Sequence, residues 1–79
     1  MNLSQLPKGG QATVLSVIDD CAHDAIAHRL RELGFVVGAS VKILAKGFLG
    51  GNPLVVRVGN TRFALRKKEA QRIQVVTSL

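Results

Sequence analysis

The residues of this chain that could bind a metal ion gather in one short segment. That segment contains one cysteine, two histidines and two carboxylates: Cys21, His23, Asp24, His28 and Glu32. Because Asp24, His28 and Glu32 are spaced four residues apart, a helix would place them on one face, where they could hold a divalent ion weakly. The spacing matches no known ligand motif and offers one imidazole on that face. We therefore expect a solvated ladder of acidic and basic groups rather than a metal site.

The sequence offers no groups for catalysis. It contains no nucleophile paired with a base, no second carboxylate placed for acid–base work, and no glycine-rich phosphate loop with its lysine. The aromatic residues are Phe35, Phe48 and Phe63, with no Trp or Tyr. This scarcity excludes a platform for stacking single-stranded bases and a groove for proline-rich helices. We expect a protein that is not an enzyme, with no catalytic residue, no metal site and no cofactor.

The charge of the chain indicates the class of partner. The 79 residues include 11 Lys and Arg against 5 Asp and Glu, which gives a formal net charge of +6. We expect an acidic partner, and charge alone leaves a protein, a nucleic acid and a membrane surface open. The chain starts at Met1 without a basic-then-apolar leader, and no window approaches the roughly 18 apolar residues of a membrane span. A lone Cys21 suits a reducing compartment. The sequence predicts one soluble, cytoplasmic domain over residues 1–79, without membrane insertion.

The candidate metal ligands lie on a predicted helix. We expect a strand at residues 11–18 and then a helix at 21–33, with Asp19 and Asp20 as candidate N-caps. At about 100° per residue, one arc of this helix is apolar and would face the core: Ala22, Ala25, Ile26, Leu30 and Leu33. Gly34 follows at the position where a left-handed conformation ends a helix.

Three alternating strands are predicted next, at residues 41–46, 54–58 and 61–66. Their inward-facing sets are Val41, Ile43 and Ala45, then Leu54, Val56 and Val58, then Thr61, Phe63 and Leu65. Gly59-Asn60 has the form of a two-residue hairpin turn with Gly at its first central position. This turn pairs Val58 with Thr61, and the resulting register agrees with the apolar alternation. Both signals therefore predict the same hairpin.

The predicted outer face of these strands is basic. The hairpin register places Arg57 opposite Arg62, where like charges cost about 0.2 to 1 kcal/mol. Lys42, Lys46 and Arg66 belong to the same face. Two interpretations stay open: a docking surface for an acidic partner, or cations that splay apart and keep the sheet soluble.

A predicted loop at residues 47–53 carries two large apolar residues, Phe48 and Leu49, framed by glycines. At a loop tip they would either anchor a partner or fold back as a plug over the barrel end. Together with the basic residues they form our candidate partner-binding set: Lys42, Lys46, Phe48, Leu49, Arg57, Arg62 and Arg66.

Four stretches of the chain, in order and without a gap, form a recognisable pattern. They are Leu3-x-x-Leu6-x-x-Gly9, Arg29-Leu30-Arg31-Glu32-Leu33-Gly34-Phe35-x-x-Gly38, Val41 to Leu44, and Ala64-Leu65-Arg66-x-x-Glu69-Ala70-x-x-Ile73-x-Val75. Over nearly the whole chain, this pattern resembles the ferrous-iron transport protein A (FeoA) family.

The resemblance implies both a fold and a function. The fold would be mainly β: a small SH3-like barrel of about five strands, with one amphipathic helix inserted after the first strand and a short helical turn near the C-terminus. Iron-dependent repressors share this fold in their C-terminal domain. The family has no agreed ligand or catalytic residue, so only structural roles carry over. Gly34 and Gly38 would bracket the turn from helix to strand, Leu65 and Ile73 would lie in the core, and Glu69 would cap the last helical turn.

The function implied is that of a small cytosolic accessory of the bacterial ferrous-iron transporter FeoB, whose G-protein domain is fused to a membrane channel. We expect a protein-interaction module that binds the cytosolic domain of FeoB and tunes ferrous-iron uptake. Two alternatives stay open. One is a nucleic-acid-binding or iron-dependent-repressor-like regulatory module, which the basic charge and the small barrel favour. The other is a carrier that binds ferrous ion directly.

Overall fold

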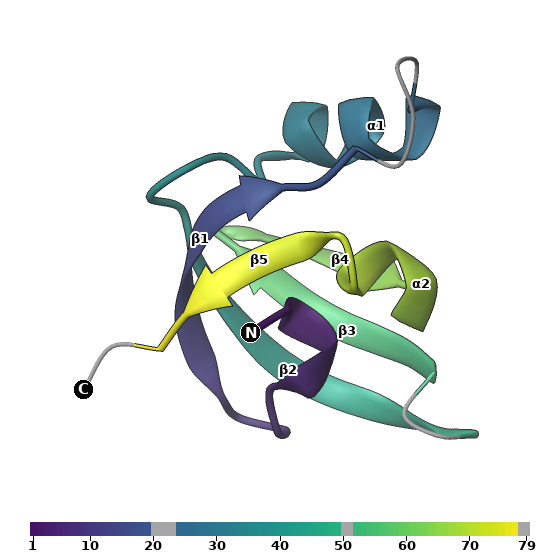
Figure 1. Ribbon diagram of the computed structural model, residues 1–79. Coiled ribbons are helices and arrows are strands. Elements are labelled where there is room, and N and C mark those ends of the chain that lie inside the picture. The colour runs from purple at the N-terminus through teal and green to yellow at the C-terminus, as the bar shows by residue number, and fades with distance from the viewer. Residues whose placement is uncertain (20–23, 50–51, 78–79) are drawn as a thin grey trace.

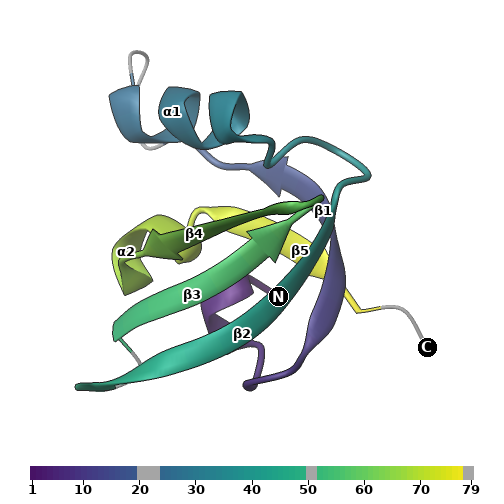
Figure 2. The same cartoon turned by 180° about the vertical axis from the view of Figure 1, so that it is seen from behind.

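A strongly curled antiparallel sheet forms most of the molecule. The computed structural model describes residues 1–19, 24–49 and 52–77, except for the side chains of Phe48 and Leu49. Within these ranges the strands are β1 (Gln11–Val17), β2 (Ser40–Leu49), β3 (Asn52–Val58), β4 (Thr61–Leu65) and β5 (Ile73–Val76). Their order in the sheet is β4-β3-β2-β1-β5, so β4 and β5 are the edges (Figures 1 and 2). The predicted mainly β, SH3-like architecture is confirmed, as an open sheet rather than a closed barrel.

Short helical segments cover the ends of this sheet. A 3-10 turn, η1 (Leu3–Gln5), precedes β1, the helix α1 (Ala25–Leu33) follows β1, and the single turn α2 (Lys67–Ala70) joins β4 to β5. Figure 1 shows α1 lying across one end of the sheet, apart from α2. The inserted helix and the C-terminal helical turn agree with the prediction. Among the described residues, no helix is long and apolar enough to cross a membrane.

Helix α1 begins later than predicted. Its N-cap is Asp24, whose Oδ1 accepts the backbone N–H groups of Ile26 at 3.1 Å and Ala27 at 3.2 Å. Asp19 does not cap the helix, because it lies more than one turn before the first helical residue, Ala25, and its carboxylate pairs with Arg31 at 2.7 Å. The predicted start at Cys21 and the alternative cap Asp20 lie outside the described residues. At the other end the prediction is correct, since Gly34 adopts φ +116° and ends the helix.

The buried stripe of α1 also differs from the predicted arc. Ala27 and Leu30 are fully buried and Leu33 is partly buried, whereas Ala25 is exposed and Ile26 is 39% exposed. The helix therefore meets the sheet along a narrow stripe spaced three residues apart. The predicted arc was too wide because the helix is short and rests on one end of the sheet. Ala22, the fifth residue of that arc, lies outside the described residues.

The β3–β4 hairpin has the predicted register. Val58 pairs with Thr61, Val56 with Phe63, and Leu54 with Leu65. All three β3 residues and Leu65 are buried, Phe63 is partly buried, and Thr61 is exposed because it lies at the turn. The structure corrects the end of β4: Arg66 is not a strand residue but precedes α2 as its N-cap.

A β-bulge interrupts the predicted alternation of β2. Ile43 pairs with Val56 but Ala45 pairs with Val55, so Leu44 is the extra residue. The inward alternation therefore holds for Val41 and Ile43, which are buried, and ends at Ala45, which is half-buried. The strand alternation carried no signal for an inserted residue.

The predicted loop at 47–53 is largely strand. Strand β2 continues to Leu49, which pairs with Asn52 at the start of β3. A glycine is needed at position 47, because a Cβ there would lie 2.3 Å from the carbonyl oxygen of Asn52. The side chains of Phe48 and Leu49 lie outside the described part of the chain, so their role as anchor or plug stays a prediction.

The core is aliphatic and extends further toward the N-terminus than the sequence indicated. Leu3 and Leu6 are at most 1% exposed, although only a turn was predicted there. Leu65 and Ile73 are core residues, as the family resemblance implied. Glu69 caps the start of α2 by accepting the Arg66 N–H at 2.9 Å, in agreement with its expected capping role.

Replacing Leu30 by Ala should lower the free energy of unfolding by about 2 to 4 kcal/mol, because it leaves a cavity between α1 and the sheet. Ile26→Ala, on the exposed side of the same helix, is the matched control and should cost less than about 1 kcal/mol. Urea unfolding followed by circular dichroism measures both. Equal losses in the two variants would show that α1 does not pack through Leu30.

Candidate protein-interaction surface

Three cations lie side by side across three strands. Lys42 of β2 pairs with Arg57 of β3, and Arg57 pairs with Arg62 of β4. Residues paired directly across antiparallel strands project from the same face, with Cβ atoms about 4.5 to 5.5 Å apart. Lys42, Arg57 and Arg62 therefore form one row on the face opposite the core, which we call the basic row. Gln11 of β1 pairs with Lys42 and continues the row with a neutral side chain.

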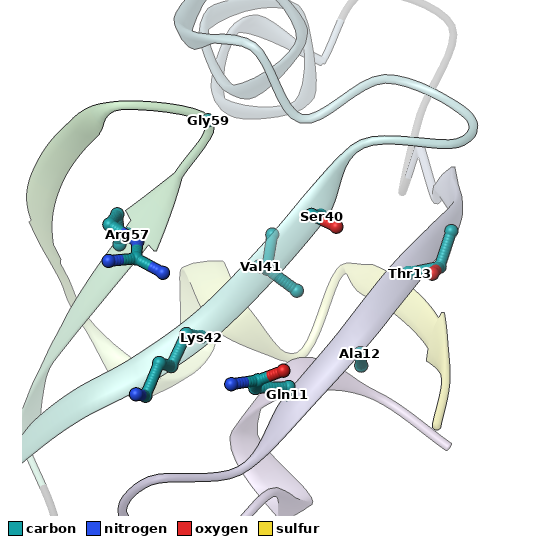
Figure 3. Close-up of a pocket in the computed structure, with 8 residues that line it drawn as sticks. All are labelled: Gln11, Ala12, Thr13, Ser40, Val41, Lys42, Arg57 and Gly59. Atoms are coloured by element: carbon teal, nitrogen blue, oxygen red, sulfur yellow. The ribbon is translucent and has the colours of Figure 1, made fainter. Parts of the chain in front are cut away.

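A small pocket lies next to the basic row. It has a volume of about 120 Å³ and is bordered by residues of β1, β2, β3 and the β3–β4 turn, including Thr13, Ser40 and Gly59. Figure 3 shows the side chains of Gln11 and Lys42 on adjacent strands and that of Arg57 on the strand beyond. Small-molecule sites are usually clefts of about 300 to 1,000 Å³. This pocket therefore suits contact with a macromolecular surface rather than enclosure of a ligand.

The described carboxylates are used elsewhere in the molecule. Three form ion pairs on or beside α1, namely Asp19 with Arg31, Asp24 with Arg72, and Glu69 with Arg29, and Glu32 contacts the imidazole of His28 on α1. Within the part of the chain that the structure describes, no carboxylate pairs with a member of the basic row. The row therefore carries uncompensated positive charge. Such a surface attracts an acidic partner and speeds its encounter.

The remaining predicted site residues lie apart from the basic row. After the bulge, Lys46 pairs with Leu54. Leu54 and Arg57 are three residues apart in β3 and project from opposite faces of the strand, so Lys46 is not part of the row that contains Arg57. Arg66 stands at the start of α2, next to two cations that our sequence analysis missed, Lys67 and Lys68. These residues border a second cleft, and the run of three basic residues in the sequence was the available signal. The side chains of Phe48 and Leu49 are not among those that the structure describes.

Three of the candidate metal ligands, Asp24, His28 and Glu32, are engaged in structural contacts. Asp24 caps α1 and pairs with Arg72, and His28 Nε2 lies 2.8 Å from Glu32 Oε1. The exposed pair His28 and Glu32 fits the expected solvated ladder, but Asp24 does not belong to it, because its side chain is 5% exposed and pairs with Arg72. Among the residues with described positions, no group of three His, Cys, Asp or Glu could hold a metal ion. Cys21 and His23 are outside that set.

The fold places the chain in the SH3-like class, and solved structures agree. The FeoA protein of Stenotrophomonas maltophilia, described as a prokaryotic SH3 domain protein and crystallised with zinc, has 59% sequence identity and a TM-score of 0.89. That match covers 96% of this chain and 89% of the other. The FeoA protein of Chlorobium tepidum has 38% identity and a TM-score of 0.83, with coverage of 98% and 70%.

A manganese-dependent transcriptional repressor shares the fold alone, at 20% identity and a TM-score of 0.84. The match covers 99% of this chain and 41% of the repressor. A comparison with curated proteins gave no significant match. The family model for the FeoA domain matches residues 1–77. The chain belongs to the FeoA family, an SH3-like family associated with ferrous-iron transport.

Because the basic row opposes like charges, replacing Arg57 by Glu should stabilise the fold. We expect the free energy of unfolding to rise by about 0.2 to 1 kcal/mol at low salt, with a smaller gain at high salt. Lys8→Glu makes the same change in net charge away from the row and is the matched control. Urea unfolding at two salt concentrations tests this. An equal gain in both variants would show that net charge, not the row, is responsible.

Proposed function

We propose that this protein is a cytosolic accessory of bacterial ferrous-iron uptake that binds the cytosolic domain of FeoB through the basic row. The observation that carries the proposal is the alignment of Lys42, Arg57 and Arg62 on one outer face, with no carboxylate partner among the described residues. Adjacent like charges lower stability, so folding alone gives no reason to align them. An acidic partner surface would turn this cost into a favourable contact.

Family membership supports the choice of partner. An association with ferrous-iron transport directs attention to the transporter, and the charge of the row predicts an acidic patch on its cytosolic domain. The pocket beside the row is too small to enclose a substrate, so this face is suited to contact with another surface. The protein would act by contact alone.

The proposal is tested by measuring association with the purified cytosolic domain of FeoB over a range of salt concentrations. The double variant Arg57→Glu with Arg62→Glu should associate on the order of tenfold more slowly at low salt, with a flatter salt dependence, because exposed charges act mainly on encounter rate. For the single variant Arg57→Glu the matched control is Lys8→Glu, which makes the same change in net charge and leaves the row intact. It should associate nearly as fast as the unchanged protein.

Equal slowing by Arg57→Glu and Lys8→Glu would contradict a role for the row, and a complete failure of the unchanged protein to bind would contradict the partner. The second candidate is a nucleic-acid-binding module, favoured by the fold shared with a repressor and by the uncompensated cations. Tight binding to DNA or RNA at physiological salt, falling steeply as salt rises, would favour that candidate instead.

A further inference from the structure

We propose that the free edge of β4 binds an extended, acidic segment of a partner polypeptide, which adds to the sheet as a further strand. This inference rests on the proposed function in one respect: the partner is a protein. The partner would present an extended acidic segment, and the β4 edge would be a second contact next to the basic row.

The two edges of the sheet differ in whether another segment of the chain pairs with them. At the β5 edge, Asn2 forms a bridge with Gln74, and the backbone N–H of Val75 donates to the carbonyl of Met1 at 2.9 Å. The N-terminal segment therefore covers that edge. At the other edge, β4 pairs with β3 alone among the described residues. Uncovered edges are templates for pairing with another chain.

The hairpin register shows which backbone groups of β4 face outward. In a hairpin with a two-residue turn, the flanking pair Val58 and Thr61 exchanges both hydrogen bonds, and the bonded pairs then alternate. The backbone groups of Arg62 and Ala64 consequently point away from β3. Both residues are exposed, and outside the strand pairing no backbone hydrogen bond involves either within the described ranges. Two N–H donors and two carbonyl acceptors are thus presented at the spacing that an added strand requires.

A groove adjoins this edge at Ala64. It lies between α1 and α2, has a volume of about 510 Å³, and is bordered by Ile26, Arg29, Ala64, Arg66, Lys68 and Glu69. Figure 2 shows β4 with α1 across from its free edge and α2 at its end. The ion pair between Arg29 and Glu69 links the two helical segments at one side of the groove. A strand added here would contact residues of α1 and α2 as well as pair with β4. An edge strand without such a groove would offer backbone pairing alone.

The charge of the groove indicates the chemistry of the occupant. Its cations are Arg29, Arg66 and Lys68, and its single carboxylate, Glu69, is held by Arg29 and by the Arg66 N–H. Acidic side chains of an extended segment would therefore be attracted, and an apolar side chain could contact Ile26, which is 39% exposed. A second copy of this chain fits less well, because antiparallel β4 pairing would bring the cations of both copies together.

The test uses a synthetic acidic peptide, Asp-Val-Glu-Val-Asp-Val, and amide hydrogen exchange measured by NMR. Binding should slow exchange of the Arg62 and Ala64 amides by about tenfold or more, because each gains a hydrogen bond, and should leave the Val76 amide unchanged. The same peptide N-methylated at alternate residues keeps its charge but loses donors, and it should bind about tenfold more weakly. Equal binding of both peptides, protection at other amides instead, or no binding at all would overturn the inference.

The variant Ala64→Pro tests the protein side, because it removes an outward N–H that the ladder to β3 does not use. Ala64→Val retains the N–H and is the matched control. We expect Ala64→Pro to weaken peptide binding by about tenfold or more and Ala64→Val to leave it within about twofold. Equal affinities would overturn the inference, and the N-methylated peptide decides the matter if Ala64→Pro fails to fold.

Failure of this inference is distinguishable from failure of the proposed function. If the peptide does not bind but the FeoB domain does, the strand-addition site is wrong and the basic row stands. If the peptide binds as expected but the FeoB domain does not, the edge site is correct and the partner has been misassigned.

Discussion

The register of the β3–β4 hairpin is the constraint on which the rest of the structure depends. Gly59 adopts φ +58° and forms a two-residue turn with Asn60, which pairs Val58 with Thr61 and Arg57 with Arg62. A slip of one residue would turn the apolar side chains outward and the arginines into the core. The same register that buries Val56 and Val58 therefore also aligns the basic row and directs the backbone of Arg62 and Ala64 to the free edge.

The acidic and the basic residues of this molecule have different roles. The described carboxylates hold α1, whose apolar contact is a narrow stripe centred on Ala27 and Leu30. Asp24 shows this most clearly, since one carboxylate caps the helix and pairs with Arg72 while its side chain is 5% exposed. Because the described acidic residues are used in orienting the helix, most of the other cations remain on the sheet and on or next to α2, with Lys8 in the turn before β1. The excess positive charge that gives the net charge of +6 is thus concentrated on part of the surface rather than spread evenly over it.

The sequence predicted those features that local signals encode. The hairpin was predictable because turn chemistry and alternation agreed, and Gly34 because a helix end needs a left-handed residue. The start of α1 was missed because three aspartates compete for the cap, and the bulge at Leu44 because alternation does not reveal an inserted residue. The Arg57–Arg62 pair was predicted, but placing Lys42 in the same row required the β2–β3 register. The groove next to β4 depends on the position of α1 relative to the sheet, and no local sequence pattern encodes that position.

The most direct test of the account is zero-length carbodiimide cross-linking of the protein to the cytosolic domain of FeoB, with the joined residues mapped by mass spectrometry. This chemistry couples a lysine amine to a carboxylate that it touches. The account predicts a cross-link from Lys42 to acidic residues of the FeoB domain, and none from Lys8, which lies in the turn before β1. Cross-links from Lys8 without any from Lys42 would contradict the claim that the basic row is the docking surface.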